Sequence, residues 1–154
     1  MAHPRIVSRG AALRALQRVR KLCAALPSVV EKEAWGRPTF RAPKMFLMFV
    51  DDHHGDGRLA LWCLADHDEQ EALVTGDPLQ YFVPPYVGPS GWVGVRLDRG
   101  LDRREVEERI TAAFHRAAPK RVLAARGGAS PQEPRRPAAR KPASRAALRR
   151  PARV

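Results

Sequence analysis

Residues 45–64 read MFLMFVDDHHGDGRLALWCL. The runs 45–50 and 58–64 are rich in apolar residues and have the length of β-strands. Between them, residues 51–57 are polar and contain two glycines, which is typical of the turn of a hairpin. This stretch therefore predicts two antiparallel strands joined by a turn.

Shorter strands are predicted on both sides of this hairpin. Residues 33–50 combine aromatic and β-forming residues with Gly36, Pro38 and Pro43, a composition that favours short strands separated by turns. Residues 92–97 alternate between two faces and predict another strand. Residues 81–83 are a further, very short candidate.

Three helices are predicted. Apolar residues at steps of three and four across residues 8–26 predict one face of a helix that Pro27 ends. Asp66 with Glu69, and Asp102 with Glu105, have the spacing of capping boxes and predict the starts of the other two, with residues 120–126 able to add one or two turns. The apolar faces are Leu13, Leu16, Val19, Cys23 and Leu26 in the first helix and Val106, Ile110, Ala113, Phe114 and Ala117 in the third.

Together these elements predict an α+β fold. A twisted antiparallel sheet of about four to six strands would be packed by the first and third helices. Cys23 and Cys63 stand among apolar neighbours with no metal-binding spacing, and we expect both to be buried, reduced thiols.

The charge of the chain is concentrated at its ends. Of the formal net charge of +12, residues 1–21 contribute six basic and no acidic residues, and residues 127–154 contribute eight basic and one acidic. Residues 22–126 are nearly neutral, with 14 basic and 15 acidic. We therefore predict a globular domain over residues 1–126 and a disordered basic tail over 127–154, which has too few large apolar residues to offset the entropy of ordering it.

The partner expected for so basic a chain is a polyanion. No apolar or aromatic anchor accompanies the charges of the tail, which favours nucleic acid over a membrane. No apolar run approaches the roughly 20 residues that cross a bilayer, and the N-terminus lacks the features of a signal peptide. We expect a cytoplasmic monomer.

Catalysis is not expected, because the sequence contains none of the common catalytic or nucleotide-binding motifs. His53 and His54, with Asp51, Asp52 and Asp56, are the best candidate metal ligands. A solvated hairpin turn explains the same residues, since such turns favour Asp-Gly and His-Gly pairs. We predict the turn, with no metal and no cofactor.

Exposed aromatic residues beside cations are a second kind of candidate site. Trp35, Tyr86 and Trp92 could stack on bases while neighbouring cations contact phosphates. Large aromatic residues more often close a small core. For Trp35, next to Gly36 and Pro38 at a strand kink, we predict a place in the core.

Several blocks of the sequence, taken in order, resemble a known family. The blocks are Trp35–Arg41, Lys44–Phe46, Leu59–Cys63, Tyr81–Gly88, Gly91–Val95 and Ala118–Arg121. Over about residues 12–126 the chain is similar to the MmcQ/YjbR family of bacterial proteins. The resemblance implies a small α+β domain similar to the frataxin-like CyaY fold, described as a double-wing DNA-binding motif.

The same resemblance assigns roles to individual positions. Positions implied to determine shape are Trp35, Gly36, Pro38, Phe40, Gly91 and Trp92, and the recurring basic positions are Lys44, Lys120 and Arg121. Leu64 stands where the family often has a lysine, so a phosphate contact is not expected there. Iron binding is not expected either, because residues 8–26 contain no acidic residue.

The function predicted from these observations is DNA binding of low sequence specificity, with duplex DNA as the expected ligand. The cations expected to contact it are Arg37, Arg41, Lys44 and Arg96 in strands and hairpins, Lys120 and Arg121 after the third helix, and Arg135, Arg136, Arg140 and Lys141 in the tail. The alternative is a non-enzymatic module that binds a protein or a small ligand around residues 84–92, with the tail as a tether.

Overall fold

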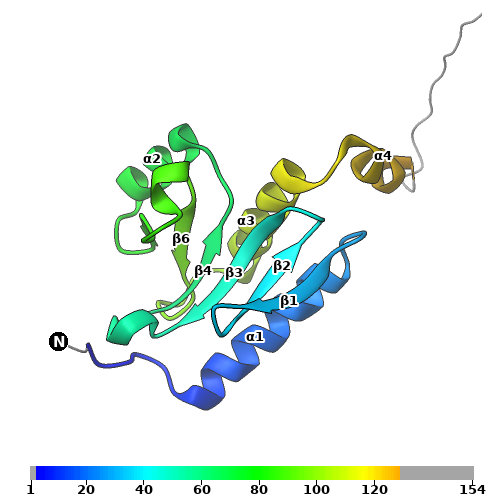
Figure 1. The fold of residues 1–154 in the computed structure, drawn as a ribbon. Coiled ribbons are helices and arrows are strands. Elements are labelled where there is room, and N and C mark those ends of the chain that lie inside the picture. The colour runs from blue at the N-terminus through cyan, green and yellow to red at the C-terminus, as the bar shows by residue number, and fades with distance from the viewer. Residues whose placement is uncertain (1–2, 129–154) are drawn as a thin grey trace, which may run out of the picture. The chain divides into compact units, whose positions relative to one another are not determined.

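The computed structural model describes residues 3–128 (Figure 1). The strands are β1 (Val30–Ala34), β2 (Arg37–Arg41), β3 (Met45–Asp51), β4 (Leu59–Cys63), β5 (Tyr81–Phe82) and β6 (Val93–Arg96). The helices are α1 (Arg9–Ala24), α2 (His67–Gly76), α3 (Arg103–Ala117) and α4 (Lys120–Gly128), with short 3-10 turns at His53–Gly55 and Gly88–Ser90.

All six strands form one sheet in the order β1-β2-β3-β4-β6-β5, and every neighbouring pair is antiparallel. The predicted α+β class and antiparallel sheet are confirmed. The hairpin of residues 45–64 lies in the middle of the sheet as β3 and β4, where Leu47 and Leu61 are completely buried. β1 and the two-residue β5 form the edges.

Helices cover one face of this sheet. α3 packs across β3 and β4 and contacts α1, and Figure 1 shows α3 behind the sheet. The strand register aligns Phe40, Leu47, Cys63 and Val93 on this face, all of them buried. Phe114 of α3 is buried as well and contributes to the same core. The predicted packing of the sheet by the first and third helices is confirmed.

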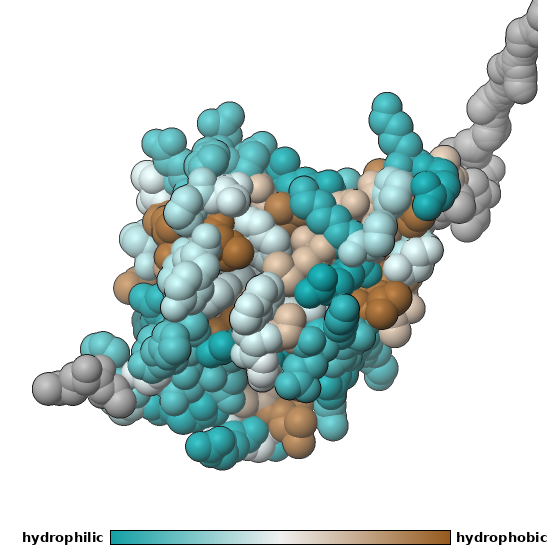
Figure 2. All heavy atoms as spheres, viewed as in Figure 1, coloured by the Kyte–Doolittle hydropathy of each residue, from teal (hydrophilic) through white to brown (hydrophobic). Residues whose placement is uncertain are grey.

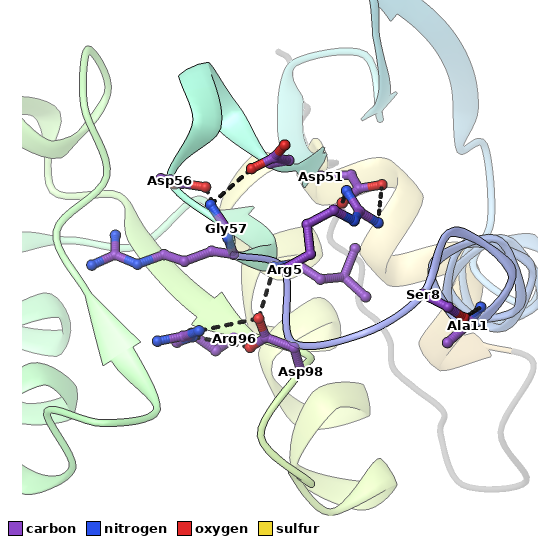
Figure 3. Close-up of polar contacts among 11 residues, drawn as sticks. Arg5, Ser8, Ala11, Asp51, Asp56, Gly57, Arg96 and Asp98 are labelled. Carbon is purple, nitrogen blue, oxygen red and sulfur yellow. Dashed lines mark hydrogen bonds and ion pairs between the residues drawn. The ribbon is translucent and has the colours of Figure 1, made fainter. Parts of the chain in front are cut away.

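The predicted buried face of the first helix is confirmed at Val19, Cys23 and Leu26 but differs at the start of α1. The helix begins after Ser8, whose hydroxyl oxygen accepts a hydrogen bond from the Ala11 amide at 3.0 Å (Figure 3). Leu13, predicted to be in the core, is 53% exposed. Steps of three and four fit two overlapping faces of this helix, and the face with the smaller side chains at its start is the buried one. The residues it buries are Ala12, Ala15, Val19 and Cys23.

The predicted helix starts at Asp66 and Asp102 are confirmed. The Asp66 carboxylate accepts a hydrogen bond from the Glu69 amide at 2.8 Å, and Asp102 accepts one from the Arg104 amide at 2.9 Å. α2 is joined to α3 by an ion pair of 2.6 Å between Glu69 and Arg109. Asp caps satisfy amides that a helix leaves without partners, which explains why both starts could be found in the sequence.

Both cysteines are free and buried, as predicted. Burial raises the pKa of the Cys23 thiol to about 12 and raises that of Cys63 as well, so both remain protonated thiols near neutral pH.

The first compact unit of the chain ends at Pro119. The domain boundary predicted at residue 126 stays a prediction. The helical residues 120–126 belong to the second unit, in which α4 extends to Gly128. The disorder predicted for the tail falls on residues that, apart from 127 and 128, lie outside the described range. Among residues 3–128, none of the helices combines the length and apolarity needed to cross a bilayer.

Candidate nucleic-acid interface

The face of the sheet opposite α1 and α3 carries cations and aromatic rings, and we call it the open face. The strand register aligns Lys32, Thr39, Met48, Trp62 and Gly94 across it, from β1 to β6. Figure 2, viewed as in Figure 1, shows hydrophilic side chains over much of the surface with pale and brown patches between them. This face is therefore amphipathic.

A pocket of about 580 Å³ opens on this face. Its lining comes from three strands and from three connections between strands. The lining residues are Trp35, Arg37, Met48, His53, His54, Trp62, Tyr86 and Val87. Met48 and Trp62 are buried, whereas Trp35 is 70% and Tyr86 73% exposed. The pocket thus has a buried apolar floor and a rim of accessible aromatic rings.

Three residues of the pocket have a left-handed backbone, although none is a glycine. They are Trp35 with φ 54°, His54 with φ 49° and Tyr86 with φ 67°. Trp35 and Gly36 both have positive φ between β1 and β2, as a type I′ hairpin turn requires. A bulky residue in this conformation costs about 1–3 kcal/mol and is often found at functional sites. Three such residues around one pocket distinguish it from the rest of the surface.

His53 is a buried polar residue of the pocket lining and is paired with Arg37. The Arg37 Nη2 lies 2.9 Å from His53 Nδ1. Since a guanidinium only donates hydrogen bonds, Nδ1 is the acceptor and the ring proton is on Nε2. Burial, together with the charge of Arg37, lowers the pKa of His53 and keeps the ring neutral. The result is a fixed tautomer whose N–H is on the Nε2 side.

The Nε2 of His53 has no hydrogen-bond partner, although it is buried. Aromatic rings surround it, with the centroid of Trp62 at 5.2 Å and that of Tyr86 at 5.7 Å from the His53 centroid. Within residues 3–128, only one other buried side-chain polar atom, the Nε of Arg109, shares this condition. An unmet buried donor costs about 1–3 kcal/mol, so a ligand that supplied an acceptor would gain from it.

The cations predicted to contact DNA are spread over the open face. Arg37 and Arg41 belong to β2 on either side of Thr39 and share its face, but they stand at opposite ends of the strand. Arg41 is half-buried, with Nε 3.3 Å from the Thr39 hydroxyl. Lys44 is exposed in the connection from β2 to β3, close in the chain to Arg41. Arg41 and Lys44 thus form one group, and Arg37 belongs to the pocket.

Arg96 is engaged inside the domain. Its guanidinium donates two hydrogen bonds to the Asp98 carboxylate, at 2.9 and 3.1 Å (Figure 3). The Asp98 side chain is completely buried and also accepts a hydrogen bond from the Leu59 amide at 3.1 Å. Arg96 therefore compensates the buried charge of Asp98. Because Asp98 neutralises it locally, Arg96 should attract a phosphate less strongly than Lys44 does.

Two of the remaining predicted cations, Lys120 and Arg121, are exposed on α4, which belongs to the second compact unit. Arg135, Arg136, Arg140 and Lys141 lie outside the described residues.

The prediction that Trp35 fills the core is wrong, because its position in the hairpin turn holds the ring at the surface. Trp92, in contrast, is 6% exposed and takes the core role. Sequence analysis missed His53 and Trp62 as pocket residues. The alternation of β3 and β4 could have indicated Trp62, which pairs with Met48 across the hairpin, whereas the burial of His53 has no indication in the sequence.

The turn predicted at residues 51–57 is present and holds both histidines. Its Asp52 carboxylate accepts a hydrogen bond from the Gly57 amide at 2.8 Å, and Asp51 is paired with Arg5 at 2.6 Å (Figure 3). Over the described part of the chain, no group of three or more His, Cys, Asp or Glu side chains is arranged to hold a metal ion.

A one-sided six-stranded antiparallel sheet with an aromatic pocket on its open face defines a small α+β domain. Residues 24–116 match the model of the YjbR family, and the chain belongs to that family, which confirms the resemblance found in the sequence. Among solved structures, Deinococcus radiodurans protein DR2400, described with the domain DUF419, is similar with a TM-score of 0.55 and 18% identity, covering 64% of this chain and 75% of that chain. That likeness concerns the fold. No curated protein matches the sequence.

Proposed function

We propose that the protein binds DNA with low sequence specificity, through cations of the open face and the basic C-terminal residues, and that it does so without catalysis. The observation that carries this proposal is the grouping of Arg41 and Lys44 at one end of β2. Lys44 is exposed, and neither residue forms an ion pair with any of residues 3–128. Cations of this kind contact phosphates, which position a protein on DNA but carry no sequence information.

The open face carries further positive charge outside this group. Lys32 shares the open face, and the Arg58 guanidinium lies 4.1 Å from the centre of the Phe82 ring, next to Gly94 on the same face. The eight cations of residues 127–154 add a sequence-independent attraction. Complete engagement of those eight would give log K a slope against log salt of about −7.

The test compares two double variants with the same change in net charge. Arg41→Glu with Lys44→Glu removes the proposed phosphate contacts, whereas Arg103→Glu with Arg104→Glu alters exposed cations of α3 on the other side of the sheet. Binding of a duplex oligonucleotide is measured by fluorescence anisotropy at several salt concentrations. We expect the first pair to weaken binding and to reduce the salt slope by about two, one for each contact. Equal losses in both double variants would contradict the proposal for the open face.

A chain that ends at residue 126 separates the domain from the tail. It keeps the whole first compact unit, which contains the complete sheet. Salt-dependent binding by this shorter chain is the expected result. If that binding disappears, the C-terminal residues alone attract DNA.

The pocket favours a second candidate, a module that binds a small planar ligand. Its volume of about 580 Å³ falls in the range of small-molecule sites, and two of its lining residues, Tyr86 and Val87, belong to the segment 84–92 that the alternative prediction names. Binding of a free aromatic compound, with no effect of the cations around it, would favour this candidate.

A further inference from the structure

We infer that the pocket of the open face receives one unpaired nucleobase of a DNA strand, while the phosphates of that strand lie on the surrounding cations. This inference rests on the DNA binding proposed above and names what the pocket adds to it. Rings, polar groups and charges of the pocket each support the same occupant.

The rings of the pocket suit a flat ligand that enters from the surface. Trp35 and Tyr86 belong to separate connections of the sheet, and both are more than two-thirds exposed. Aromatic faces of this kind stack on bases of any sequence, because every base has a π-face. Trp62 and Met48 close the floor, so the site is deep enough to enclose a ring but open to the chain that carries it.

The buried polar group of the pocket lining suits a base as well. The Nε2–H of His53 is a donor without a partner, held in place because Arg37 occupies the other nitrogen. Every nucleobase presents an acceptor, either a ring nitrogen or a carbonyl oxygen, along its edge. Tyr86 is the exposed neighbour of His53, and we expect its ring to shift so that this edge can approach.

The charge around the pocket selects an anionic ligand over a neutral aromatic one. Arg37 is itself a lining residue, Lys32 lies on the same face of the neighbouring strand β1, and Arg41 lies on this face at the other end of β2. A nucleotide joins a planar base to a phosphate, so it uses both the rings and the cations. Since a base in an intact duplex is stacked and paired, the pocket predicts a preference for single-stranded DNA or for an extruded base.

The experiment uses the full chain and measures fluorescence anisotropy with two labelled probes at equal salt. One is an oligothymidylate of about 15 nucleotides, a usual size for such sites, and the other is a duplex of the same length. We expect Trp35→Ala to weaken binding of the oligothymidylate about tenfold, with a change of less than about twofold for the duplex. Trp35→Phe, which keeps a ring, should retain most of the affinity.

Leu79→Ala is the matched control, because Leu79 is 64% exposed but does not line the pocket. It should leave both affinities unchanged. Thermal unfolding of each variant verifies that the fold is intact, which we expect since both substituted side chains lie at the surface.

The outcomes separate this inference from the proposed function. If both probes bind and Trp35→Ala affects neither, DNA binding stands and the inference about the pocket is overturned. If neither probe binds the unaltered chain, both fail. If free thymidine monophosphate binds as tightly as the oligothymidylate, with the same loss in Trp35→Ala, the pocket is a small-ligand site and the inference is overturned.

Discussion

The two faces of the sheet use aromatic residues in opposite ways. On the helix-covered face, Phe46 and Phe114 meet edge to face with ring centroids 5.8 Å apart, and neither is accessible to solvent. On the open face, Trp35 and Tyr86 remain largely exposed and have a left-handed backbone. The first arrangement stabilises the fold, whereas the second costs stability. Aromatic residues kept exposed at such a cost indicate a surface that acts on something outside the chain.

The largest expected effect is on the helix-covered face. Phe114→Ala removes a completely buried ring and leaves a cavity beside Phe46. We expect the free energy of unfolding to fall by about 3–5 kcal/mol, measured by urea denaturation. Trp35→Ala serves as the comparison and should change it by no more than about 0.5 kcal/mol. Similar losses in the two variants would remove the distinction between the faces.

A smaller loss is expected where the open face has a buried hydrogen bond. Arg37→Ala leaves the His53 Nδ1 without its donor. We expect the free energy of unfolding to fall by about 1–3 kcal/mol, since an unsatisfied buried acceptor is costly. Urea denaturation of Arg37→Ala and of Arg41→Ala provides the measurement. We expect the free energy of unfolding to change less in Arg41→Ala. A stability unchanged in Arg37→Ala would show that the pair with His53 contributes nothing to the fold.

His53 also makes the stability of the fold depend on pH. Because its pKa is lower in the folded chain than the ordinary value of about 6.5, the unfolded chain binds the proton more readily. The contribution of His53 to stability is therefore complete above pH 6.5 and is lost as the pH falls toward the folded pKa, by at most about 1.4 kcal/mol per pH unit. His53→Phe should flatten this part of the curve of melting temperature against pH. An identical slope in the variant would contradict the neutral, Arg37-bound ring.

The smallest expected effect is a gain. Asn adopts the left-handed region more readily than Trp, so Trp35→Asn should stabilise the hairpin by up to about 1 kcal/mol. The same variant should lose affinity for single-stranded DNA, because it has no ring to stack. A rise in melting temperature together with weaker binding would show that Trp35 contributes to binding at a cost in stability. A destabilised variant would mean that the Trp35 ring supports the fold.

Most of the fold could be predicted because local patterns determine it. The alternation in β6, the polar turn between β3 and β4, and the capping aspartates at 66 and 102 each depend on neighbouring residues alone. The buried face at the start of α1 could not be predicted in this way, because steps of three and four allow either Ala12 or Leu13 to be buried.

The pocket could not be predicted in the same way. It forms where Trp35, His53 and Tyr86 meet from three connections that are far apart in the chain, and only tertiary structure brings them together. A left-handed tryptophan is also contrary to backbone preference, so general rules placed its ring in the core. The exposed position of Lys44 beside a turn could be predicted, because it needs no tertiary contact.

The arrangement of β1 has a consequence for how the protein behaves in concentrated solution. As an edge strand, β1 leaves one row of backbone amides and carbonyls available to another chain. Its middle carries three consecutive charged residues, Glu31, Lys32 and Glu33, and Glu31 is held by Arg20 at 2.8 Å. A second copy that paired along this edge would have to desolvate these charges. The charges of β1 thereby disfavour fibre-like self-association along this edge. The protein can expose aromatic rings on the neighbouring open face without aggregating by strand pairing at β1.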